Sequence, residues 1–79
     1  MTVKFFWKQD CPKCPSAKAM VSTMDNVEYF SLDEPGGLAE AAFYSIMATP
    51  SVVISKADGS EVVAFRGDVP PNEVLREWL

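Results

Sequence analysis

Short runs of apolar residues mark four candidate strands along the chain. Residues 3–7 and 27–32 are rich in β-branched and aromatic side chains, as buried strands usually are. Two more such runs, at 51–55 and 61–65, flank a short segment with Asp58-Gly59, a pair typical of hairpin turns. We therefore expect the last two strands to form an antiparallel hairpin.

Apolar residues with helical spacing fill the stretches between these strands. One stripe follows Cys14 and ends near residues 25–26, a second spans Leu38–Met47 and is broken by Thr49-Pro50, and a third follows Pro70-Pro71. The residues of these stripes that we expect in the core are Met20, Met24, Met47 and Trp78.

These elements follow one another in the order β-α-β-α-β-β-α. This order predicts an α/β fold over residues 1–79, as a single domain with a four-stranded mixed sheet flanked by three helices. Both of the first two β-α-β connections are expected to join parallel strands. Residues 33–37, Asp-Glu-Pro-Gly-Gly, are expected to form a plain turn before the second helix.

The composition excludes several classes of function. With no histidine and only two cysteines, the chain has neither a Ser-His-Asp triad nor a four-ligand zinc site of its own, and we expect no cofactor or metal. A net charge of −4 argues against nucleic acid as a partner. No signal segment or membrane-spanning stretch is visible, so we expect a cytoplasmic monomer that has no membrane partner.

The two cysteines carry the chemistry that remains open. Cys11 and Cys14 are one helical turn apart, close enough for a disulfide. We expect Cys11 at the N-terminus of the first helix, with Pro12 in the first helical position. The helix dipole, Lys8 and Lys13 would then stabilise Cys11 as a thiolate. Cys14, inside the first turn, would resolve the mixed disulfide.

Charge is distributed unevenly around this pair. Residues 1–20 carry four lysines and one acid, a balance of +3, whereas residues 21–79 carry three basic and ten acidic residues, a balance of −7.

A Cys-x-x-Cys beside a β-α-β unit favours redox chemistry. The pair could instead bind zinc or an iron–sulfur cluster together with another chain, or consist of two buried structural cysteines.

Four motifs follow one another along the chain. They are Phe5-Phe6-Trp7, Cys11-Pro12-Lys13-Cys14, Thr49-Pro50 before a strand, and Gly67 before the last helix. Over essentially the whole chain this order resembles the thioredoxin-like superfamily, in its small glutaredoxin-like and thioredoxin-like branch. The resemblance implies a dithiol–disulfide oxidoreductase that reduces protein or small-molecule disulfides. It also implies a cis Thr49–Pro50 bond beside the cysteines, where an extended substrate would lie.

Within this superfamily the motifs are mixed. Lys8 and Gly67-Asp68 resemble the glutathione contacts of glutaredoxins, whereas the threonine directly before Pro50 resembles thioredoxins. Phe5 stands where thioredoxins have a buried acid, and Pro15 directly after Cys14 is unusual. The resemblance thus implies either glutathione or a thioredoxin-reductase-type enzyme as electron donor.

The resemblance and the charge pattern together give one set of expected substrate contacts. They are Lys8, Pro12, Lys13, Thr49, Pro50, Gly67 and Asp68. The expected partners are proteins that carry disulfides. The alternative is a redox-inactive or metal-binding interaction module with the same fold.

Overall fold

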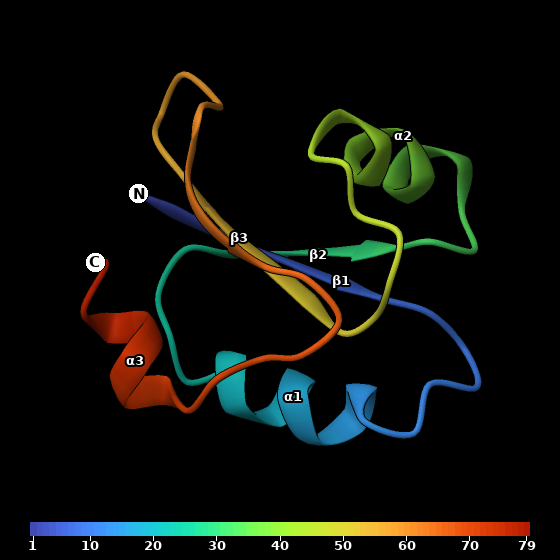
Figure 1. The fold of residues 1–79 in the computed structure, drawn as a ribbon, viewed down its shortest axis with the longest axis horizontal. Coiled ribbons are helices and arrows are strands. Elements are labelled where there is room, and N and C mark those ends of the chain that lie inside the picture. Colours follow the sequence, from blue (N-terminus) through green and yellow to red (C-terminus); the bar gives the residue numbers. More distant parts are fainter.

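The computed structural model describes all residues 1–79 and contains seven elements in the predicted order (Figure 1). They are β1 (Thr2–Trp7), α1 (Cys14–Val21), β2 (Val27–Ser31), α2 (Pro35–Phe43), β3 (Ser51–Ser55), β4 (Glu61–Phe65) and α3 (Asn72–Arg76). None of the three helices combines the length and the hydropathy that a membrane span requires.

The four strands form one mixed sheet in the order β2-β1-β3-β4. β1 is parallel to β2 and antiparallel to β3, and β3 is antiparallel to β4. The predicted mixed sheet and its hairpin are therefore confirmed. The expectation that the second β-α-β connection also joins parallel strands is wrong, because β3 runs opposite to both β1 and β2.

The length of α2 explains the direction of β3. This helix ends at Phe43 rather than at Met47, which leaves residues 44–50 as a connecting segment. The N–H groups of its first three residues, 44–46, still donate to carbonyls of residues 40–42 at the end of α2, and the rest of the segment returns the chain to the sheet. The pairs Trp7↔Ser31 and Phe6↔Ser51 show that β2 ends and β3 begins at the same end of β1.

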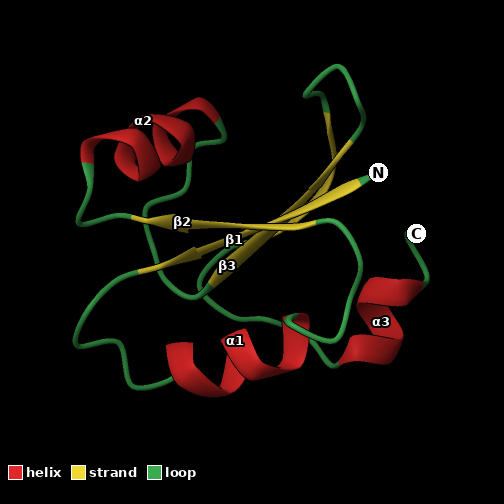
Figure 2. Ribbon diagram, turned by 180° about the vertical axis from the view of Figure 1, so that it is seen from behind, coloured by secondary structure: helices red, strands yellow, loops and turns green.

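Helices cover both faces of the sheet, α1 and α3 on one face and α2 on the other (Figure 2). β1 alternates between the two cores, with Val3 and Phe5 facing α1 and Phe6 facing α2. Every residue of β3 is buried, as expected for an inner strand that is covered on both faces. Both cores therefore converge on the two inner strands, whose ends carry the candidate site.

The face of α2 that packs against the sheet is made of small residues. The large apolar residues with helical spacing in this segment lie elsewhere on the helix. Gly37 and Ala41 are buried, whereas Leu38 and Phe43 are 55% and 73% exposed. A Cβ on Gly37 would lie 1.9 Å from the carbonyl oxygen of Ser31, so the helix approaches the sheet more closely than a side chain permits. The predicted loop at residues 33–37 is accordingly shorter, because α2 already begins at Pro35.

Two of the expected core residues lie at the surface. Met47 is 92% exposed because it lies in the connecting segment and not in α2. Trp78 is 43% exposed because α3 ends at Arg76, and the helical stripe that begins at Val74 and Leu75 stops there. Met24 is buried as predicted, and Met20 is partly buried.

Lys4 links β1 to α2 on the face away from α1. It forms an ion pair with Glu40, and its Nζ donates to the Tyr44 hydroxyl over 3.2 Å. The Tyr44 hydroxyl donates in turn to the Gly59 carbonyl over 2.6 Å. Desolvation alone would lower the pKa of Lys4, but the hydrogen bonds to Glu40 and Tyr44 together outweigh it and raise the pKa above its ordinary 10.5.

We expect Lys4→Met to lower the free energy of unfolding by about 1–2 kcal/mol at pH 7, since Glu40 loses its partner. Because the folded-state pKa of Lys4 is raised, this stabilisation is complete below the ordinary pKa of 10.5 and is lost as pH rises through the folded value. Urea unfolding of both proteins at pH 7 and at about pH 11 measures the difference. A difference that stays the same at the higher pH would contradict a role for the lysine charge.

Candidate functional site

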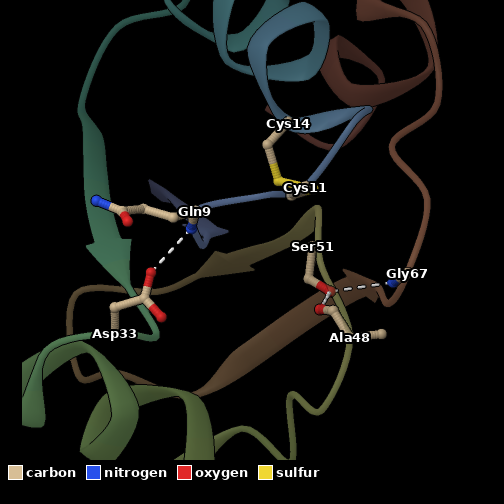
Figure 3. Close-up of a disulfide and its surroundings, with 7 residues drawn as sticks. All are labelled: Gln9, Cys11, Cys14, Asp33, Ala48, Ser51 and Gly67. Carbon is tan, nitrogen blue, oxygen red and sulfur yellow. Dashed lines mark hydrogen bonds between the residues drawn. A yellow bond between two sulfur atoms is a disulfide. The ribbon is translucent and has the colours of Figure 1, made fainter.

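The two cysteines form a disulfide at the end of the sheet where β1 and β2 finish and β3 begins (Figure 3). Cys11 lies in the loop after β1, and Cys14 is the first residue of α1, with 5.4 Å between their Cα atoms. Cys14 is only 5% exposed, whereas Cys11 is half-buried. A molecule that approaches from solvent therefore meets Cys11 first.

The helix begins two residues later than the sequence pattern indicates. Pro12 was expected in the first helical position, but α1 starts at Cys14, and Pro15 takes its second position. The Cys14 N–H donates to the Cys11 carbonyl over 3.2 Å, which closes a tight turn. A helical bond from residue 15 to that carbonyl is impossible because proline has no N–H. Cys11 therefore precedes the helix, and Cys14 rather than Pro12 occupies its first position.

A loop from the next β-α connection supports the segment before the cysteines. The Gln9 N–H donates to Asp33 Oδ2 over 2.8 Å (Figure 3). The Leu32 N–H donates to the Trp7 carbonyl over 2.8 Å. Asp10 has a φ of +59°, in the left-handed region that aspartate tolerates better than most residues. The chain thus leaves β1 in a defined direction before it reaches Cys11.

Two further loops lie on the other side of the disulfide. The first contains Thr49-Pro50, whose peptide bond is cis, as the resemblance implied. The second contains Gly67, with a φ of +86°. The Ser51 side chain connects the two loops, since its hydroxyl donates to the Ala48 carbonyl and accepts from the Gly67 N–H (Figure 3).

A groove of about 360 Å³ runs between α1 and these loops. Four of the expected contact residues line it: Pro12, Lys13, Pro50 and Asp68. The sequence interpretation missed four others, which are Ser16, Ala17, Met20 and Val69. The helical stripe had assigned Met20 to the core, Ala17 belongs to the core as well as to the groove lining, and nothing in the sequence distinguishes Ser16 or Val69.

The other expected contacts lie outside the lining of this groove. Lys8 is exposed and lies in the loop before the cysteines, while Thr49 and Gly67 are partly buried neighbours of Pro50 and Asp68. A second hollow of about 450 Å³ lies away from the cysteines, between the end of α1 and α3. Neither hollow is lined by a cysteine, but the smaller groove is lined by Pro12 and Lys13, which lie between the two cysteines in the chain, and by Pro50. We therefore place the site in the smaller groove.

The four lysines of the N-terminal segment do not act together on the cysteines. Lys4 is paired with Glu40 on the α2 face, and Lys18 lies over the rings of Trp7 and Tyr29 at 5.2 and 5.5 Å. Lys13 is the lysine that lines the groove. Lys8 and Lys13 are exposed and take part in no salt bridge. No cluster of three or more His, Cys, Asp or Glu side chains is arranged to hold a metal ion.

Comparison with known families identifies the fold. A family model described as thioredoxin domain matches residues 1–79. The chain belongs to the thioredoxin family. The Cys11–Cys14 disulfide fits a Cys-x-x-Cys motif within this fold, and the general role of this thioredoxin-family protein is thiol–disulfide redox chemistry.

Solved thioredoxin structures superpose over nearly the whole chain. A thioredoxin from Thermus thermophilus shares 27% identity with a TM-score of 0.63, covering 98% of this chain and 69% of that one. Thioredoxin 1 from Thermosipho africanus has 18% identity and a TM-score of 0.70, covering 96% and 88%. The oxidised C-terminal domain of Neisseria meningitidis DsbD has 18% identity and a TM-score of 0.70, covering 98% and 76%. No curated protein matches the chain.

Proposed function

We propose that the protein reduces disulfides in other molecules, with Cys11 as the attacking cysteine and Cys14 as the resolving cysteine. The observation that supports these roles best is the difference in burial. Cys14 is 5% exposed, while Cys11 is half-buried and is followed directly by Pro12 and Lys13 of the groove lining. A substrate sulfur must approach the attacking sulfur in line, which the protein fold around Cys14 obstructs.

The reaction begins from the reduced protein. The Cys11 thiolate attacks one sulfur of the substrate disulfide, so that a new S–S bond forms while the substrate bond breaks, and the departing thiolate takes a proton from water. Cys14 then loses its proton and attacks Cys11 Sγ, which forms the internal disulfide and releases the second substrate thiol. Two electrons have passed from protein to substrate. The Cys11–Cys14 disulfide of the structure corresponds to this oxidised end state.

We further propose that a protein substrate lies in the groove as an extended segment. Pro12 and Lys13 would contact it from the α1 side, and Pro50 and Asp68 from the opposite loops. Thr49 and Gly67 would contribute through their backbones as neighbours of those loops. Lys8, exposed before the cysteines, would attract anionic groups.

Insulin reduction by the chain with dithiothreitol as electron source tests the proposed function. Turbidity from the released B chain should appear faster than with dithiothreitol alone. A matched protein with both cysteines replaced by serine should not exceed the dithiothreitol rate. Equal rates for the two proteins would refute disulfide reduction.

For the electron donor, we expect a thioredoxin-reductase-type enzyme or another dithiol protein to be more efficient than glutathione, by about tenfold in kcat/KM. Glutathione carries two carboxylates, but the lining of the groove contains one cation, Lys13, and also one anion, Asp68. The charge of −7 over residues 21–79 also repels an anionic tripeptide at a distance.

Steady-state assays, in which each donor is regenerated with NADPH, measure the ratio of the kcat/KM values for the two donors. Asp68→Asn is the informative variant, since removal of this anion should improve glutathione as donor more than it improves the dithiol donor. Efficient turnover with glutathione and none with a thioredoxin reductase would contradict the expectation and favour a glutaredoxin-like specificity.

A further inference from the structure

One buried hydroxyl joins the two loops that face α1 across the groove. Ser51, the first residue of β3, has an exposed fraction of 0%. Its Oγ donates to the Ala48 carbonyl over 2.6 Å and accepts from the Gly67 N–H over 3.0 Å (Figure 3). Both distances are those of well-formed hydrogen bonds, so the hydroxyl satisfies one group in each loop.

The bonded residues lie directly beside the groove. Pro50 precedes Ser51 and Asp68 follows Gly67 in the chain, and both Pro50 and Asp68 line the groove. The loops also touch, since a Cβ on Gly67 would lie 3.5 Å from that of Ala48. A change in the hydrogen bonding of Ser51 would therefore shift one groove-lining residue relative to the other.

We propose that Ser51 is a positioning residue for the disulfide substrate. Its hydroxyl sets the distance between Pro50 and the Asp68–Val69 segment, and a substrate segment has to fit against both. Ser51 does not itself reach the substrate, because it is fully buried. This inference rests on the proposed function, and it concerns the binding of an extended protein substrate rather than the sulfur chemistry.

The test compares variants that differ in the hydroxyl but not in shape. Valine and threonine have the same shape, so Ser51→Val removes the hydroxyl and Ser51→Thr retains it, while Ser51→Ala adds no bulk. Ser55→Ala is the matched control, because Ser55 is 1% exposed on the same strand and its hydroxyl has no hydrogen-bond partner. Each variant is assayed with insulin and with the small disulfide 5,5′-dithiobis(2-nitrobenzoate).

We expect Ser51→Ala and Ser51→Val to raise the KM for insulin about tenfold, with kcat changed by less than about twofold. Ser51→Thr and Ser55→Ala should stay near the wild-type KM. Reduction of the small disulfide, which needs only access to Cys11, should change by less than about twofold in all variants. A purely structural role would instead lower the active fraction, and hence both rates equally, without moving KM.

An independent measurement needs no variant. The Gly67 amide of the wild-type protein should exchange slowly with D₂O, because its acceptor is a buried hydroxyl. Fast exchange at Gly67, or a wild-type KM in both Ser51→Ala and Ser51→Val, would overturn the positioning role even when disulfide reduction itself is intact. If the wild-type protein reduces neither substrate, the proposed function fails and this inference fails with it.

Discussion

Cys11→Ser is expected to lower the rate of disulfide reduction by at least about a hundredfold, whereas Cys14→Ser is expected to stop the reaction at a mixed disulfide. The two cysteines have different roles because they have different surroundings. Cys11 is half-buried beside the groove and near Lys13, while Cys14 is 5% exposed at the first position of α1. Without Cys14, the substrate sulfur that is bound to Cys11 has no internal thiol to displace it.

Mass spectrometry of Cys14→Ser after incubation with an oxidised substrate should detect the covalent adduct. The matched control is Cys11→Ser under the same conditions, which should show none. Iodoacetamide labelling of the reduced wild-type protein at mildly acidic pH gives a second measurement, since the thiolate reacts. Faster labelling of Cys14 than of Cys11 would reverse the assignment of the two roles.

Gly37→Ala is expected to destabilise the fold by about 3 kcal/mol. A Cβ at this position would lie 1.9 Å from the Ser31 carbonyl oxygen and 2.7 Å from its carbonyl carbon. Both atoms belong to the backbone of β2, so α2 as a whole has to move away from the sheet. This movement would also loosen the α2 core around Ala41.

Gly36→Ala is the control for this experiment, because it lies in the same turn of α2 with nothing within 4 Å of its added Cβ. Replacing a helical glycine by alanine at an open position should raise the free energy of unfolding by about 0.5–1 kcal/mol. Chemical denaturation of the wild-type protein, Gly36→Ala and Gly37→Ala measures the change in the free energy of unfolding for each substitution. If Gly37→Ala is as stable as Gly36→Ala, the close approach of α2 to β2 is wrong.

The sequence was sufficient for the parts of the site that depend on local chemistry. The spacing of Cys11 and Cys14 places their sulfurs within bonding reach, and the structure joins them. Thr49-Pro50 and Gly67 were recognised from their order relative to the cysteines, and both lie in loops beside the groove. Such features depend on short segments in which proline restricts the backbone or glycine permits a positive φ.

Residues of the groove that come from helix α1 could not be recognised in this way. Met20 has helical spacing with the buried Val21 and Met24, so its partial exposure at the groove cannot be read from periodicity. Ser51 had no sequence signal at all. Its role depends on Ala48 and Gly67 being brought together, and Gly67 is distant from it in the sequence.

The sequence by itself determined the order of the elements, the two hydrophobic faces of β1 and the cysteine pair, because each depends on residue type and on spacing within one element. Only the tertiary structure decided that β3 runs antiparallel to β2 and that Gly37 and Ala41, not Leu38 and Phe43, face the sheet. The reason is that helical spacing predicts which residues share one side of a helix, but not which side packs against the sheet. The close contact with Ser31 selects the stripe of small residues, and the early end of α2 leaves the segment that returns the chain to the site.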